Sequence, residues 1–232
     1  MAVVPMLSLL IALPLAGAVL LLLIRNHEGE RDRFVHWIAL AISLVEFVGT
    51  LWLWVGFDPR RADFQFVERV DWIPSFGIQY AVGVDGISLF LVVLTGFLTP
   101  LALLCSWESV HKKVTAFCAF MLALESAMIG VFLSLDMFLF YIFWEAMLIP
   151  MYFLIGVWGY DRRVYAAVKF ILYTMAGSVL MLVAILWLYF YQKGFTGTAR
   201  FDLDAYYALP ISAAAQLWLF LAFAGAFACL FA

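Results

Sequence analysis

Three ionisable side chains in apolar stretches are the candidates for chemistry in this sequence: Glu125, Glu145 and Lys169. A charged side chain at the centre of a membrane-spanning helix costs roughly 2.5–3.5 kcal/mol on insertion scales, so such residues mark functional sites by default. A carboxyl group away from water can hold or release a proton, and a nearby cation biases that equilibrium. These residue types could therefore hold or release a proton.

The spacing of the two glutamates predicts that they form a pair. Glu125 lies ten residues before Leu135, and Glu145 lies ten residues after it, on either side of a tight turn at Leu135-Asp136. At about 1.5 Å of rise per residue, an antiparallel helical hairpin would place both roughly 15 Å from the turn. Two neighbouring carboxyl groups near mid-bilayer could hold and release a proton at ordinary pH.

Each candidate also has a structural explanation. Glu145 could serve only as a hydrogen-bonding residue between helices. Pro150 cannot donate to the carbonyl of Ala146, so it either weakens the helix beside this glutamate or makes a harmless kink. Lys169 either points inward as a relay cation or snorkels to the headgroups. A third acid in an apolar run, Glu46, is expected to be an interfacial or helix-packing residue.

Composition identifies the elements that must position these residues. The chain is 67% hydrophobic and 12% charged, with a mean hydropathy of +1.06. A soluble domain averages about 45–50% apolar and about 25% charged residues, so the solvent of this chain must be lipid. The net charge of −3 gives no reason to expect nucleic acid as a partner. Neither a nucleotide-binding loop nor metal-ligand spacing is present, so we expect no cofactor and no metal ion.

Seven apolar runs are long enough to span a bilayer, which takes roughly 20 residues. We predict an all-α membrane protein of about seven transmembrane helices, at approximately 3–24, 34–57, 86–107, 114–135, 137–158, 167–190 and 211–232. Partial alternation of polar and apolar residues in 58–85 predicts a short β-hairpin outside the membrane, between helices 2 and 3. The polar segment 191–210 is predicted to be a loop with a short helix.

We expect residues 1–113 to form an N-terminal part, with three helices and the hairpin at 58–85. Residues 114–232 are expected to form the first part of a translocation bundle, with four helices. Basic residues such as Lys112, Lys113, Arg162 and Arg163 lie in the loops on one side. The positive-inside rule then places the N-terminus of this multi-pass protein outside.

A long motif around helices four and five goes beyond these general features. It reads DMFLFYIFWEAMLIPMYFLIGVWG from Asp136 to Gly159, with supporting matches at Asp85–Ser88, Lys169-Phe170 and Tyr173-Thr174. The motif closely resembles the M subunit (chain 4) family of proton-pumping NADH:quinone oxidoreductase, respiratory complex I. The related Mrp-type cation/proton antiporters share a looser form of it.

The resemblance implies an antiporter-like subunit that moves protons in the membrane arm of an oxidoreductase and carries no redox centre itself. Its partners would be other membrane-arm subunits and the lipid bilayer. Its location would be a bacterial inner membrane, with the N-terminus on the periplasmic side. Glu145 matches the family's helix-five glutamate, which pairs with a helix-seven lysine. Glu125 matches a helix-four acid, and Lys169 matches a helix-six lysine near the proton entry.

The sequence departs from the family near its end. Leu230 stands where the family has the helix-seven lysine, and the second inverted half is absent. The chain therefore resembles an N-terminal fragment of such a subunit. Two other functions remain open at this point: a cation/proton antiporter subunit, and a truncated product that does not pump.

Overall fold

The computed structural model describes residues 5–24 and 31–231 of the chain. They divide into two compact units, which we describe separately. The first unit comprises Met1–Glu68 and Val82–Leu133, and the second comprises Arg69–Ala81 and Ser134–Ala232.

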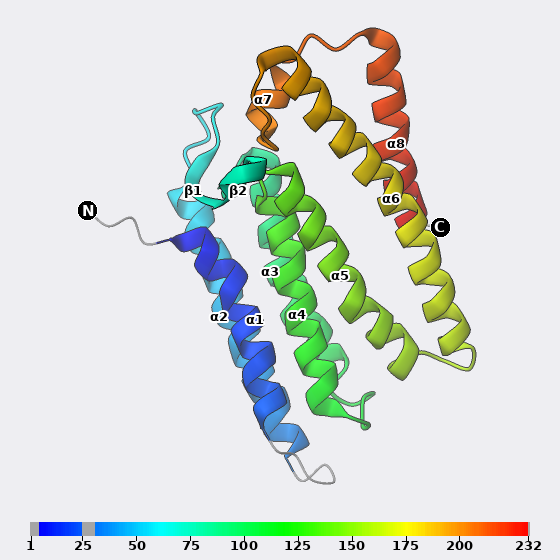
Figure 1. The fold of residues 1–232 in the computed structure, drawn as a ribbon. Helices are drawn as coiled ribbons and strands as arrows, with labels where there is room; N and C mark the ends of the chain where they lie inside the picture. Colours follow the sequence, from blue (N-terminus) through cyan, green and yellow to red (C-terminus); the bar gives the residue numbers. More distant parts are fainter. Residues whose placement is uncertain (1–4, 25–30, 232) are drawn as a thin grey trace. The chain divides into compact units, whose positions relative to one another are not determined.

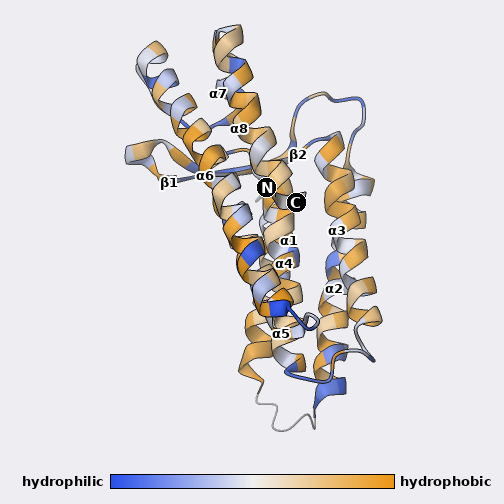
Figure 2. Ribbon diagram, turned by 90° about the vertical axis from the view of Figure 1, so that its right-hand side faces the viewer, coloured by the Kyte–Doolittle hydropathy of each residue, from blue (hydrophilic) through white to orange (hydrophobic). Residues whose placement is uncertain are grey.

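Helices dominate both units. Among the described residues, six helices are long and apolar enough to cross a membrane, and a seventh helix contains a shorter apolar stretch at Ala213–Cys229. The six are α1 (Met6–Leu23), α2 (Asp32–Gly56), α3 (Gly86–Cys105), α4 (Val114–Leu133), α5 (Met137–Trp158) and α6 (Arg163–Thr196), and the seventh is α8 (Ala213–Phe231). Figure 2 shows that they are hydrophobic over most of their length and hydrophilic mainly near their ends. The predicted helices are confirmed, although α6 continues beyond its predicted end at 190.

The predicted β-hairpin is also present. Strands β1 (Gln65–Ile73) and β2 (Ile78–Val84) pair, and the 3-10 turn η1 (Pro74–Phe76) connects them. Gly77 closes this turn with a φ of 66°, and a Cβ atom at this position would lie 2.2 Å from the carbonyl oxygen of Ala199. Only glycine fits there. The link between α6 and α8 contains the short helix α7 (Leu203–Tyr207), as predicted.

In the first unit, α1 packs antiparallel to both α2 and α4 (Figure 1). Gly17 allows this close approach, since a Cβ there would lie 2.8 Å from Ile42 Cδ1 and 3.2 Å from Leu122 Cδ1. Farther along, the Ser126 hydroxyl donates to the carbonyl of Ile11 at 2.6 Å. One apolar core joins the four helices and comprises Ala18, Leu21, Val35, Ala39, Leu103, Val114, Cys118, Ala119 and Leu122.

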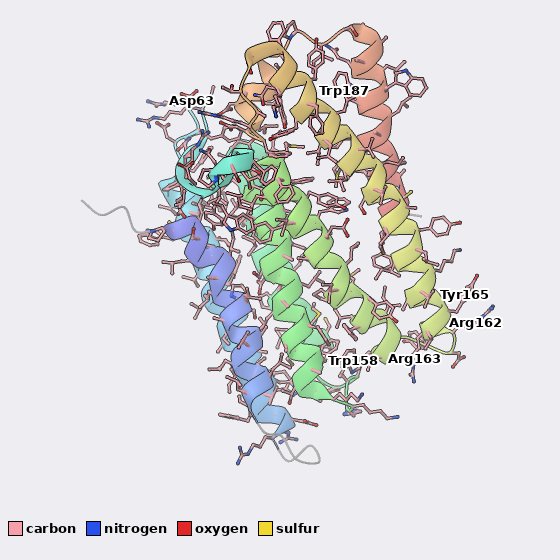
Figure 3. The ribbon with its side chains drawn as sticks, viewed as in Figure 1. Asp63, Trp158, Arg162, Arg163, Tyr165 and Trp187 are labelled. Atoms are coloured by element: carbon pink, nitrogen blue, oxygen red, sulfur yellow. The ribbon has the colours of Figure 1, made fainter. Side chains whose placement is uncertain are left out.

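In the second unit, α6 packs along both α5 and α8 (Figure 1). Gly177 brings α6 close to α8, because a Cβ there would lie 3.1 Å from the Cα of Ala226. Figure 3 shows Trp158, Arg162, Arg163 and Tyr165 gathered at the turn between α5 and α6. Aromatic and basic residues are enriched at membrane–water interfaces, so this turn has the composition of a helix end at the bilayer surface.

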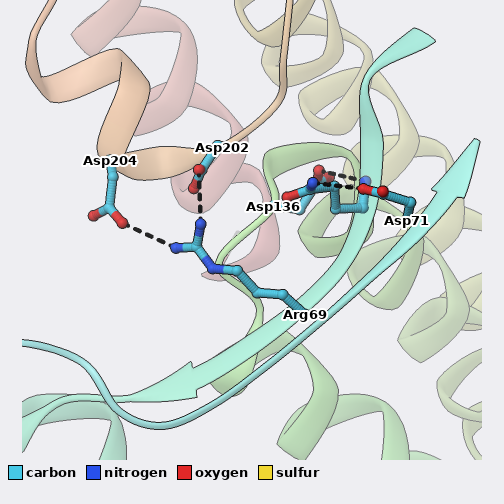
Figure 4. A network of polar contacts seen from close by, with 6 residues as sticks. Arg69, Asp71, Asp136, Asp202 and Asp204 are labelled. Carbon is cyan, nitrogen blue, oxygen red and sulfur yellow. Dashed lines mark hydrogen bonds and ion pairs between the residues drawn. The ribbon is translucent and has the colours of Figure 1, made fainter. Parts of the chain in front are cut away.

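A polar network joins three segments of the second unit (Figure 4). Arg69 of β1 forms ion pairs with Asp202 at 3.1 Å and with Asp204 at 3.0 Å. Asp136 caps α5 by accepting hydrogen bonds from the backbone N–H groups of Phe138 and Leu139, and it also accepts from the N–H of Gln79 in β2. The network therefore fixes the hairpin against the start of α5 and the segment that leads into α7.

The start of α1 is stabilised by a carboxylate from β1. Glu68 accepts hydrogen bonds from the backbone N–H of Leu7 at 2.8 Å, from that of Ser8 at 3.1 Å and from the Ser8 hydroxyl. The first N–H groups of a helix have no partner within the helix, and its N-terminus carries partial positive charge. Glu68 provides both an acceptor for these N–H groups and a negative charge near the helix N-terminus, where α1 has no capping side chain of its own.

We predict that Glu68→Gln lowers the free energy of unfolding by about 1 kcal/mol, because the amide keeps one acceptor but loses the charge that favours this helix end. Thermal unfolding in detergent micelles measures the effect. Asp63→Asn, a change of the same type at an exposed site outside this contact, is the matched control. Equal stability of the Glu68 variant and the parent would contradict the assigned capping role.

We also predict a pH dependence from Asp136. Burial raises the pKa of this carboxyl above its ordinary value of 3.8, against the lowering effect of the backbone N–H groups that it accepts. The folded state thus binds the proton more tightly than the unfolded chain, so this group's contribution to stability is complete below pH 3.8 and is lost as the pH rises. Asp136→Asn should therefore gain stability relative to the parent as the pH rises from acid to neutral. A gain that shrinks over that range would refute this assignment.

Candidate functional site

Glu145 lies within α5, and its side chain is half-buried. Its Oε1 atom has no hydrogen-bond partner among the residues that the structure describes. Tyr141, one helical turn earlier, brings its hydroxyl within hydrogen-bonding reach of this carboxylate and of Ser178 on α6. Glu145, Tyr141 and Ser178 therefore form a small polar group between two apolar helices.

The helix is locally weakened beside Glu145. Pro150 lies inside α5 and has no N–H to donate to the carbonyl of Ala146. Trp144, adjacent to the glutamate, is 4% exposed, and its indole N–H also lacks a partner within the described part of the chain. Its ring instead packs edge-on against Phe227 of α8, with centroids 5.0 Å apart. The surroundings of Glu145 thus include buried side-chain polar atoms that have no hydrogen-bond partner among the described residues.

Lys169 lies near the start of α6, and its side chain is exposed. Its ammonium group is 5.5 Å from the centroid of the Tyr173 ring, which is a cation–π distance. Lys169 is about 9 Å along its helix from the α5–α6 turn, while Glu145 is about 20 Å from it. The structure therefore places these two residues at different depths and does not pair them.

Glu125 belongs to the first unit, where it is fully buried in α4. Thr99 of α3 approaches its carboxylate, but the Thr99 hydroxyl donates to the carbonyl of Thr95 at 3.1 Å. Neither carboxylate oxygen of Glu125 has a hydrogen-bond partner in the described residues. Because Glu125 and Glu145 belong to different units, their pairing stays a prediction.

Glu46 is the residue that sequence reasoning undervalued. It is fully buried in α2, both of its oxygens lack partners among the described residues, and it interacts electrostatically with Glu125. Full burial among helices excludes the expected interfacial position and agrees with the helix-packing alternative. A signal was available in the sequence, since Ser43, Glu46 and Thr50 recur with helical spacing and all three are 0% exposed.

The three glutamates share one property that matters for chemistry. Each has at least one oxygen without a partner among the described residues, so protonation of that oxygen would break no hydrogen bond or ion pair that the structure describes. A neutral carboxyl is also the form that an apolar environment tolerates best. The arrangement is therefore suited to holding protons inside a membrane. Leu230, which stands where the resemblance leads us to expect a lysine, has a side chain outside the described part of the structure.

Two family models match the chain in succession. Residues 64–135 match the amino terminus of NADH-ubiquinone oxidoreductase chain 4. Residues 134–231 match the transmembrane model shared by NADH:quinone oxidoreductase and Mrp antiporters. The second match contains Glu145 and Lys169, and the first contains Glu125.

Two similar curated proteins are both named NADH-quinone oxidoreductase subunit M. NADH-quinone oxidoreductase subunit M of Rickettsia prowazekii is 40% identical over 222 residues, which cover 95% of this chain and 45% of the relative. The subunit M of Rhodobacter capsulatus is 48% identical over 185 residues, which cover 79% of this chain and 36% of the relative. The chain therefore spans less than half the length of these two relatives.

Solved structures agree on the fold. A chain of respiratory complex I from Thermus thermophilus with bound NADH is 27% identical with a TM-score of 0.79, over 96% of this chain and 43% of that chain. A chain of the Mrp complex from Dietzia has a TM-score of 0.76 at 20% identity, a likeness that extends to the fold alone. The protein is thus a multi-pass integral membrane protein, and it belongs to the family of NADH:quinone oxidoreductase subunit M, also called chain 4.

Proposed function

We propose that this chain is a proton-translocating subunit in the membrane arm of an NADH:quinone oxidoreductase. The observation that carries the proposal is Glu145, an acid on a membrane-spanning helix whose Oε1 atom lacks a partner among the described residues. It lies in the segment matched by the oxidoreductase and antiporter model. An ionisable group that lipid-embedded helices retain at such cost is best explained by ion movement.

In the proposed route, a proton enters on the inner side near Lys169 and moves along α6 toward Glu145. Two hydroxyls on α6 are almost fully buried: that of Thr174 lies between those depths, and that of Ser178, one turn further on, lies near the level of Glu145. Both donate to backbone carbonyls of their own helix, which leaves their oxygens free to accept from water. The backbone carbonyl that Pro150 leaves without its helical donor would give water a place to bind next to Glu145. Glu125 would be a further proton site on the route.

The wider assignment follows from the relatives and is part of the same proposal. The chain would be a subunit of the oxidoreductase without a redox centre of its own, in contact with other membrane-arm subunits. It would reside in a bacterial inner membrane, with its N-terminus on the periplasmic side. The division into an N-terminal part up to residue 113 and a translocation part from 114 also stays a prediction.

A cation/proton antiporter subunit is the less favoured function. The Mrp complex resembles this chain in fold at only 20% identity. Relatives at 40% identity and above, from three genera, are instead named as quinone oxidoreductase subunits.

The test is Glu145→Gln, introduced into the complete oxidoreductase that contains this sequence. Glutamine keeps the shape of the side chain but cannot exchange a proton. We predict that NADH-driven proton pumping into membrane vesicles falls to background, while the assembled complex is still recovered. A pH-sensitive dye reports the pumping, and native gel electrophoresis reports the assembly.

Glu108→Gln is the matched control, because Glu108 is exposed in the link between α3 and α4. It should assemble and pump like the parent. An assembled Glu145 variant that pumps at the parental rate would overturn the proposed role of this residue.

A further inference from the structure

Two fully buried carboxylates, Glu46 of α2 and Glu125 of α4, lie at the same level of the first unit. At Gly17, α1 is in contact with both Ile42 of α2 and Leu122 of α4. Glu46 follows Ile42 by four residues, and Glu125 follows Leu122 by three. Since α2 and α4 both run antiparallel to α1, they run in the same direction. Each carboxylate therefore lies about one turn beyond that contact.

A second set of contacts, nearer the start of α1, brackets the position of the two carboxylates along the helix axis. Gly49 of α2 is close to Leu10 of α1, where a Cβ would lie 2.8 Å from Leu10 Cδ2. Ser126 of α4 donates to the carbonyl of Ile11, the next residue of α1, at 2.6 Å. Both acids are thus held between two turns of α1, which agrees with the electrostatic interaction between them.

No cation is available near the pair within the four helices. None of α1, α3 and α4 contains a lysine, an arginine or a histidine. In α2 the basic residues Arg33 and His36 precede Glu46 by thirteen and ten residues, which correspond to about 20 and 15 Å. The remaining titratable groups of these helices are Asp32, Cys105 and Cys118.

The hydroxyls around the pair are engaged elsewhere as donors, although that of Thr99 also lies close to the Glu125 carboxylate. Each of them donates to a backbone carbonyl: Ser43 to Leu40, Thr50 to Phe47, Thr95 to Leu91, Thr99 to Thr95 and Ser126 to Ile11. All five side chains are at most 6% exposed. The pair is therefore surrounded by acceptor oxygens, and its own four oxygens have no donor within the described residues.

Two ionised carboxylates at close range in an apolar interior repel each other, and each also loses its hydration. A proton removes the repulsion, and the resulting O–H group can donate to the other carboxylate, as in dyads of two acids. We propose that Glu46 and Glu125 form a proton-sharing pair that holds at least one proton at neutral pH. That the pair takes part in translocation rests on the proposed function, whereas its holding of a proton does not.

Infrared spectroscopy of the full chain in lipid nanodiscs, labelled with ¹³C at the glutamate carboxyl, tests the proposal. The wild type at neutral pH should show the carbonyl band of a protonated glutamic acid that shifts in D₂O. We expect Glu46→Gln and Glu125→Gln each to shift or remove this band, and the double variant to lose it. The difference between wild type and double variant cancels any band from Glu145. Glu108→Gln, at an exposed site, should leave the band intact.

Three results would overturn the proposal. One is the absence of a protonated-acid band at neutral pH from the difference between the spectra of the wild type and the double variant. Another is a band that Glu46→Gln leaves unchanged, which would assign the proton to Glu125 alone. The third is a band that sodium chloride removes, which would identify a metal cation as the occupant. The ¹³C and D₂O shifts are measured on the wild type, so they decide whether a buried protonated glutamate exists even if a variant misfolds. Loss of pumping in the complex is a separate measurement, which tests only the proposed function.

Discussion

The structure depends on one constraint, which is that polar groups inside a hydrocarbon layer must find partners within the protein. Backbone groups meet this constraint by forming helices, and most of the described chain is helical. Side chains meet it unequally. Serine and threonine hydroxyls donate to carbonyls one turn earlier, but the carboxylates of Glu46, Glu125 and Glu145 keep oxygens without a donor among the described residues. We therefore propose these acids as the groups that hold protons.

The two units place their acids in different surroundings. In the first unit, Glu46 and Glu125 are fully buried and interact electrostatically, and no basic residue lies close to them in the four helices. In the second, Glu145 is half-buried and stands within reach of Tyr141, close to a proline inside its helix. A buried pair suits the storage of a proton, whereas a half-buried acid at a weakened helix suits its exchange. The polar network around Asp136 is separate from both and serves the fold.

Apolar run lengths were sufficient to predict the helices, because membrane thickness and backbone hydrogen bonding leave few alternatives. The partial alternation of polar and apolar residues predicted the hairpin. Glu125 and Glu145 were predicted as site residues from their charge in apolar runs, from their spacing about a tight turn and from the family resemblance. The environment of Glu46 required the packed structure, since one acid in an apolar run does not reveal which helix faces it. The ion pairs of Arg69 join residues more than 130 positions apart, so no local pattern could have predicted them.

The central claim is that Glu145 exchanges a proton when the oxidoreductase turns over. It is tested most directly by NADH-induced infrared difference spectra of the assembled complex with ¹³C-carboxyl glutamate in this subunit, subtracting the spectrum of a Glu145→Gln sample. We expect a carboxyl carbonyl signal that appears or disappears on NADH addition and is absent from the variant. Identical difference spectra of parent and variant would show that Glu145 does not change its protonation during turnover.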